Sequence, residues 1–220
     1  MLGALFYPKG TVEKPTSFES LYIPYIYKEI YLEGIYMDIF NTRENMVCID
    51  IGANIGIVTQ YMRDFSKVVY AIEPATEHYE ALVKNIEFNK WTNVVPIHAA
   101  IMDKDGRMKL NLDSANRTCH SFVFEGGPER TKSEMVRTMT FETLFKEQKI
   151  DKVDFVKFDV EGAEESILMG ESFAKVADKI SAMIVEFHFP TFPKIVEHMI
   201  KLGFKARRYD SSAIVCLFSK

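Results

Sequence analysis

The sequence predicts an α/β fold: a doubly wound, mostly parallel β-sheet with helices on both faces and an antiparallel last strand. Three observations indicate this class. From residue 46 onward, short apolar runs alternate with segments of helical periodicity, which is typical of parallel sheets. A turn with two glycines, in "CIDIGANIG", follows the first apolar run. The chain ends in two strand-like runs separated by "DSS", which predicts a hairpin and therefore a reversed last strand.

The bulk composition is that of an ordinary globular protein. Of the 220 residues, 47% are hydrophobic and 26% are charged, so one core can form without disulfides. The three cysteines, Cys48, Cys119 and Cys216, form no CxxC pair, which disfavours a zinc ribbon and indicates a reducing cytoplasm. The net charge of −4 disfavours a nucleic-acid partner. We expect a cytoplasmic protein with neither a signal peptide nor a membrane span.

A single domain is expected over residues 1–220, with a helical N-terminal segment (1–45) before the α/β core (46–220). Residues 18–40 have helical character from Pro24 onward and contain five tyrosines. Packing of these rings against the sheet is the simpler interpretation, and an aromatic wall over a substrate cleft is the alternative.

In the first half of the core, the sequence pattern predicts three strands and two helices. The second helix can be capped by Thr76. Asp105-Gly106 predicts a hairpin turn into "RMKLNL". The expected strands are 46–50, 68–74 and 94–102, and the expected helices are 55–65 and the segment after Thr76.

The second half begins with an irregular stretch, residues 113–136, which we expect to be mobile and to act as a lid. Regular structure then resumes, and Ile195, Val196, Met199 and Ile200 are expected to face inward from the last helix. The expected elements are a short helix in 139–148, a strand that begins at Val153, a helix from Gly162, a strand at 181–189, a helix from Pro193 to Gly203 and the final hairpin.

The turn after the first strand predicts a nucleotide-type site. Its pattern is G-x-x-x-G, formed by Gly52 and Gly56, and lacks the middle glycine that admits a pyrophosphate. Asp50 would repel two phosphates, whereas Glu73, at the end of the second strand, can accept both hydroxyls of a ribose. S-adenosylmethionine carries an ammonium, a sulfonium and a ribose, so it fits better than NAD. We expect Asn54, in the same turn, to contact this cofactor too.

The stretch "VDFVKFDVEGAEESILMG" places charges at alternate positions near a strand end. Lys157, Asp159 and Glu161 should share one face where ligands bind in open α/β sheets. Lys157 can neutralise Asp159 and so make its burial tolerable. The next strand offers Glu186 and His188. The functional interpretation is a site that positions a hydroxyl and accepts its proton, and the alternative is a structural ion-pair network.

The identity of the general base stays open at this level. His188 has a suitable ordinary pKa, and His120, Asp159 and Glu161 are alternatives. His98, on the third strand, could lie near the adenine or simply pack. A divalent cation could bind the carboxylates as well, although no ligand spacing demands one.

These motifs resemble the FkbM family of S-adenosylmethionine-dependent methyltransferases, over roughly Met46 to Phe189. The resemblance rests on "CIDIGANIG", "AIEP", "AAIMDKDG" and "FVKFDVEGAEESILMG". The family's K-x-D-x-E-G-x-E pattern matches Lys157, Asp159, Glu161, Gly162 and Glu164.

The resemblance implies a Rossmann-like, seven-stranded methyltransferase sheet and methyl transfer, commonly to a hydroxyl oxygen of a sugar, glycan or secondary metabolite. We also expect Ala100 and Asp159 to contact the cofactor. The expected catalytic residues are Asp159, Glu161, His188 and Lys157.

Two other functions stay open: a catalytically silent cofactor-binding or scaffold protein of the same fold, and a nucleic-acid methyltransferase. Methylation of base amino groups commonly uses an N/D-P-P-Y/F segment, where this chain has "DVEGAE". The partner is therefore expected to be a small-molecule or glycan acceptor.

Overall fold

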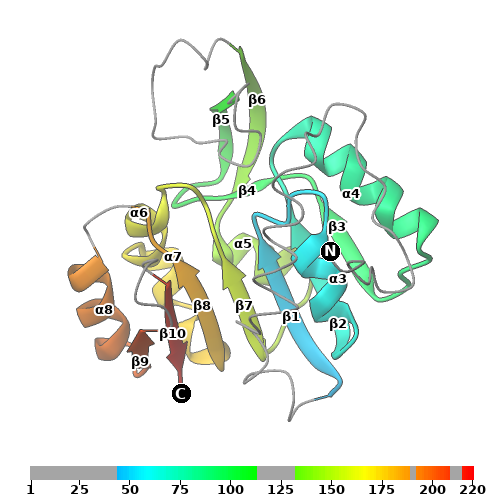
Figure 1. Cartoon of the computed structure of the whole chain (residues 1–220). Coiled ribbons are helices and arrows are strands. Elements are labelled where there is room, and N and C mark those ends of the chain that lie inside the picture. Colours follow the sequence, from blue (N-terminus) through cyan, green and yellow to red (C-terminus); the bar gives the residue numbers. More distant parts are fainter. Residues whose placement is uncertain (1–43, 113–131, 189–191, 209–214) are drawn as a thin grey trace, which may run out of the picture.

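The computed structural model describes residues 44–112, 132–188, 192–208 and 215–220 (Figure 1). The expected N-terminal helical segment, except for its last two residues, lies outside the described residues. So do most of the expected lid, the turn of the final hairpin, and His120.

A seven-stranded sheet forms the centre of the molecule, in the order β3-β2-β1-β7-β8-β10-β9 (Figure 1). β10 runs antiparallel to both neighbours, and the other strands share one direction. This confirms the Rossmann-like, mostly parallel sheet with an antiparallel last strand. The strands are β1 (Met46–Ile51), β2 (Ser66–Ile72), β3 (Val94–Ile97), β7 (Phe155–Phe158), β8 (Ala182–Glu186), β9 (Lys205–Arg208) and β10 (Val215–Ser219).

Helices cover both faces of this sheet, as predicted. Alternate residues along β1, β7 and β8 enter two separate hydrophobic cores, because successive side chains of a strand point to opposite faces. α3 (Ile57–Arg63) and α4 (Thr76–Phe88) pack on one face. The other face packs against α5 (Phe141–Glu147), α6 (Glu164–Leu168), α7 (Glu171–Ala174) and α8 (Phe192–Lys201), with the short 3-10 helix η2 (Ala177–Lys179) nearby.

A second, three-stranded sheet projects from the molecule beside the main one (Figure 1). It contains β4 (Ala100–Ile101), β5 (Gly106–Leu112) and β6 (Lys132–Met139), with β6 in the middle. The predicted single strand 94–102 was therefore wrong, since it divides between the two sheets. The hairpin predicted at Asp105-Gly106 was also wrong, because β5 pairs antiparallel with β6 rather than with the preceding strand. β6 also includes residues 132–136, which were expected to be irregular.

Two smaller predictions are corrected. Ala75, not Thr76, is the N-cap of α4, and the Thr76 hydroxyl instead donates to Glu134 on β6 at 2.6 Å. Ile200 is 54% exposed rather than inward, whereas Ile195 and Met199 of α8 are fully buried. None of the helices among the described residues has the length and apolar character needed to cross a bilayer.

Candidate functional site

The glycine turn after β1 packs directly on the end of β7. Gly52 has φ +74°, and a Cβ there would lie 2.2 Å from the carbonyl oxygen of Asp159. Gly56 has φ +97°, and its Cβ would lie 2.7 Å from Leu82 of α4. Both positions therefore require glycine because of protein contacts and positive φ. Asn54 also has a positive φ of 51°, which asparagine tolerates better than most residues.

Asp50, next to the end of β1, is a fully buried carboxylate. The Thr59 hydroxyl of α3 donates to its Oδ2 at 2.6 Å, and Lys157 Nζ lies 3.9 Å from its Oδ1. No hydrogen-bond donor among the described residues reaches that Oδ1. Burial raises the pKa of Asp50, and the neighbouring Lys157 and Thr59 only partly offset this effect.

Glu73 follows β2 and ties the glycine turn to the start of α4. Its Oε2 accepts from the backbone N–H of Asn54 at 2.8 Å, and its Oε1 accepts from that of Ala75 at 2.9 Å. His78 Nδ1 lies 3.7 Å from Oε1. Burial alone would raise the pKa of Glu73, but His78 and the two N–H groups outweigh it and hold the pKa below its usual value.

Lys157 connects this turn to the charged end of β7. Its ammonium donates to the carbonyl of Gly52 at 2.9 Å and to Asp159 Oδ2 at 3.2 Å. The Lys157 side chain is only 8% exposed. The predicted pairing of Lys157 with Asp159 is thus present, and the same ammonium also binds the glycine turn.

Asp159, Glu161 and His188 form what we call the acid–imidazole group. His188 Nε2 lies 3.4 Å from Glu161 Oε2 and 3.8 Å from Asp159 Oδ1. On the other side of the ring, Nδ1 lies 2.8 Å from Glu164 Oε1. Glu164 begins α6, is 2% exposed and also accepts from the backbone N–H of Gly162 at 3.0 Å. The ring of His188 is therefore held by a buried carboxylate.

These carboxylates change the acid–base behaviour of His188. Burial lowers the pKa of the imidazole, but the hydrogen bond to Glu164 and the charges of Asp159 and Glu161 together raise it to about 9. In this state both ring nitrogens of His188 are protonated at neutral pH, so the ring donates hydrogen bonds rather than accepting them. We expected His188 to be the general base because an ordinary imidazole is largely neutral at pH 7. The raised pKa removes this reason.

The remaining predicted residues lie around this edge or outside the described chain. Ala100 is buried in β4, where it pairs with Thr138 of the small sheet. His98 lies just beyond β3 and stacks on Tyr79 of α4, with ring centroids 4.4 Å apart. Glu186 ends β8, two residues before His188.

Three residues that contribute to the site were not singled out from the sequence. Thr59 binds Asp50, His78 faces Glu73, and Glu164 holds His188. Glu164 belongs to the recognised pattern but had no role, because only the fold shows that the start of α6 reaches the end of β8. Thr59 is a polar residue among buried positions of α3, which was a usable signal.

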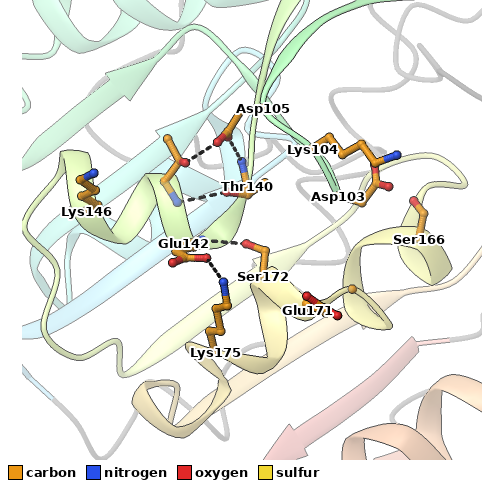
Figure 2. Close-up of a pocket in the computed structure, with 12 residues that line it drawn as sticks. Asp103, Lys104, Asp105, Thr140, Glu142, Lys146, Ser166, Glu171, Ser172 and Lys175 are labelled. Carbon is orange, nitrogen blue, oxygen red and sulfur yellow. Dashed lines mark hydrogen bonds and ion pairs between the residues drawn. The ribbon is translucent and has the colours of Figure 1, made fainter.

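A separate open pocket lies between α5, α6 and α7 (Figure 2). Several of its polar groups are paired with one another: Asp105 accepts from Thr140 and Thr143, and Lys175 donates to Glu142 at 2.8 Å. None of the predicted site residues lines it. We therefore place the candidate site at the ends of β1, β2, β7 and β8 and not in this pocket.

Comparison with known proteins adds the following. The family described as methyltransferase FkbM domain matches residues 50–206. Methyltransferase sdnD of Sordaria araneosa is 27% identical over 176 residues, covering 66% of this chain and 68% of that protein. Hexuronic acid methyltransferase AglP of Haloferax volcanii is 28% identical over 159 residues, covering 71% of this chain and 62% of that protein. The chain thus spans about two thirds of the first relative's length and less of the second's.

A third relative is a different kind of transferase. The tRNA(Phe) (4-demethylwyosine(37)-C(7)) aminocarboxypropyltransferase of Methanocaldococcus jannaschii is 38% identical over 86 residues, covering 38% of this chain and 32% of that protein. Among solved structures, an rRNA methylase from Streptococcus thermophilus superposes with a TM-score of 0.51 at 12% identity, covering 86% of this chain and 93% of that one. That similarity supports the fold. The family match and the two methyltransferase relatives support methyltransferase activity.

Proposed function

Because this chain belongs to the methyltransferase FkbM domain family, we propose that it is an S-adenosylmethionine-dependent methyltransferase acting on a hydroxyl oxygen of a sugar, glycan or secondary metabolite. One observation carries the proposal. The glycine turn is bonded to Glu73 through the Asn54 N–H and to Lys157 through the Gly52 carbonyl. A cofactor-type turn and a polar group suited to a hydroxyl therefore share one edge of the sheet.

The residues present fit this cofactor. S-adenosylmethionine brings an ammonium and a sulfonium, and the edge carries the carboxylates of Asp50 and Glu73. Asp50 Oδ1 is buried and has no donor among the described residues, so it suits an ammonium or a water that binds one. Each oxygen of Glu73 accepts one backbone N–H, and a carboxylate oxygen can accept a second donor such as a ribose hydroxyl.

Methyl transfer depends more on the alignment of the acceptor oxygen with the methyl carbon than on activation of that oxygen. The cofactor supplies an electrophilic methyl carbon. The acceptor oxygen would take this methyl group as the carbon–sulfur bond breaks, and the cofactor would leave as a neutral thioether. In our proposal Asp159 and Glu161 orient the acceptor hydroxyl and receive its proton, while Lys157 keeps Asp159 in place. The side chains of Asp159 and Glu161 are partly exposed, at 26% and 19%, so an acceptor can approach them, although the Oδ1 atom of Asp159 is itself buried.

The aminocarboxypropyl transferase among the relatives makes a second reaction a specific alternative. A nucleophile can attack either the methyl carbon or the aminocarboxypropyl carbon of the same sulfonium. The first reaction leaves S-adenosylhomocysteine, and the second leaves methylthioadenosine. Chromatography of the nucleoside product therefore separates the two functions without knowledge of the acceptor's full structure.

The test starts with calorimetric titration of the protein with S-adenosylmethionine and, separately, with NAD. We expect saturable binding of the first only. Incubation with a panel of sugars and hexuronic acids should then yield S-adenosylhomocysteine and a product heavier by one methylene. A methyl ether survives mild alkali whereas a methyl ester does not, so alkaline treatment shows whether a hydroxyl was the acceptor. NAD binding without S-adenosylmethionine binding would refute the proposal. Binding without any turnover across the panel would favour the silent cofactor-binding alternative.

A further inference from the structure

The acid–imidazole group has the dimensions of a cation site. One ligand atom from each of Asp159, Glu161 and His188 can be chosen so that all three lie within 4.8 Å of one another. Mg²⁺ holds its ligands at about 2.1 Å, so ligand atoms around one ion lie about 3.0 Å apart when adjacent and about 4.2 Å apart when opposite. The separations of 3.4 and 3.8 Å from His188 Nε2 fall between these limits. Only small side-chain movements would bring the three ligand atoms to bonding distance from one ion.

The orientation of His188 is the one that metal-binding histidines adopt. A metal-binding imidazole usually donates its second ring N–H to a carboxylate, which fixes the ring and makes the other nitrogen a better ligand. Glu164 occupies that position on Nδ1 at 2.8 Å, and it is almost fully buried. Nε2 is thereby directed toward Asp159 and Glu161. A cation bound there would displace the proton that Nε2 carries in the ion-free protein.

The unsatisfied oxygen of Asp159 points independently to a missing ligand. Its Oδ2 accepts from Lys157, but the Oδ1 atom is buried and no donor among the described residues hydrogen-bonds it. Buried oxygens without partners are uncommon in folded proteins, and an ion or a water is a usual explanation. The same Oδ1 faces His188 Nε2.

The local charge also favours a cation. The carboxylates of Asp50, Asp159, Glu161 and Glu164 surround one ammonium, that of Lys157, and one imidazole. Carboxylates in such excess are costly to desolvate unless further positive charge is nearby. A divalent ion would supply that charge at the point where three of its ligands already meet.

We infer that Asp159, Glu161 and His188 form a divalent-cation site, with Glu164 as a positioning residue that holds the imidazole. Two carboxylate oxygens and one imidazole nitrogen suit an ion that accepts mixed oxygen and nitrogen ligands, such as Mn²⁺, and leave further coordination positions open. The use of those positions to bind the acceptor oxygen rests on the proposed function. There the cation would bind the hydroxyl oxygen and make its proton easier to remove, and the proton would pass to a carboxylate oxygen of the pair that does not bind the ion.

The site can be tested with Mn²⁺ alone, because its paramagnetic resonance signal falls when the ion is bound. We expect about one saturable Mn²⁺ per chain. Glu161→Gln and His188→Asn should each weaken binding at least tenfold, and Glu164→Gln should weaken it by about ten- to a hundredfold through the lost orientation of the ring. Glu197→Gln removes an exposed carboxylate paired with Lys201 on α8, so it should leave binding unchanged.

Calorimetry with S-adenosylmethionine on the same samples separates this inference from the proposed function. Loss of Mn²⁺ binding with retained cofactor binding in Glu161→Gln supports the site. Absence of saturable Mn²⁺ binding in the wild type, or equal binding in wild type and Glu161→Gln, refutes the site and leaves the cofactor result standing. Competition by Mg²⁺ and by Zn²⁺ against bound Mn²⁺ then shows which ion the site prefers. If His188→Asn does not fold, Glu161→Gln decides the question, because that side chain is partly exposed.

Discussion

A side chain at Gly52 would place its Cβ 2.2 Å from the carbonyl oxygen of Asp159. The turn after β1 and the residue after β7 are therefore in direct backbone contact. Lys157 reinforces that contact by donating to both residues, at 2.9 Å to the Gly52 carbonyl and at 3.2 Å to the Asp159 carboxylate. The glycine turn and the acid–imidazole group of the candidate site are thus mechanically connected.

Gly52→Ala should strongly destabilise the protein. Gly203→Ala is the matched control, since Gly203 also has a positive φ, +90°, but a Cβ there meets nothing within 4 Å. The control should lose about 1–2 kcal/mol from left-handed backbone strain alone. Gly52→Ala should lose a further roughly 1–3 kcal/mol because the backbone must shift. Urea denaturation measures both, and equal losses would contradict the contact.

Lys157→Met should destabilise the fold by roughly 3–5 kcal/mol, as the removal of one partner from a buried charge pair does. The change leaves Asp50 and Asp159 without their shared ammonium. Lys201→Met, which breaks an exposed pair with Glu197, should have little effect. Thermal melting of both variants checks this. A melting midpoint for Lys157→Met equal to that of the wild type would show that Asp50 and Asp159 do not need the ammonium for stability.

Glu73→Gln should alter the pH dependence of stability. The pKa of Glu73 is lowered from 4.5 in the folded protein, so its stabilising effect is present above that value and is lost as the pH falls through the folded pKa. The substituted side chain has a single carbonyl oxygen to meet the N–H groups of Asn54 and Ala75, so the variant should be less stable at pH 7. The difference from wild type should shrink below about pH 4.5. A constant difference from pH 7 to pH 3 would contradict the lowered pKa.

Glu161→Gln should leave folding and S-adenosylmethionine affinity close to wild type. Methyl transfer should fall at least about a hundredfold, the lower scale for loss of a positioned acid–base group. Glu165→Gln is the control: Glu165 lies four residues on and bonds Lys194 at 2.6 Å, away from the acid–imidazole group. Product formation with an identified acceptor measures both variants. Equal turnover in the two would show that Glu161 has no catalytic role.

Local sequence patterns predicted much of the candidate site. Strand periodicity placed Lys157 on β7 and Asp159 and Glu161 near its end, although β7 stops at Phe158 and Glu161 lies in a turn with φ +50° rather than on the strand. The glycine spacing predicted the turn after β1, with Glu73 directly after the next strand. These predictions succeeded because each depends on residues close in sequence within one strand or turn.

The small sheet could not be predicted in the same way. The run 94–102 is apolar throughout, and its periodicity does not show that Ala100 leaves the main sheet to pair with Thr138. β5 pairs with β6, which follows the irregular stretch, and not with β4, the strand that precedes it in sequence. Pairing between strands far apart in sequence depends on which edges the rest of the fold leaves open.

The sequence alone predicts the class of fold, the strand ends at which the candidate site lies and the residue types placed there, because periodicity and turn chemistry are local properties of the chain. Tertiary structure decided which of those residues meet. It brought Glu164 of α6 against His188, set Lys157 between two carboxylates and left one oxygen of Asp159 without a hydrogen bond among the described residues. Side-chain partnership and burial set the charge state of each group, and both arise only when separate strands and helices pack together.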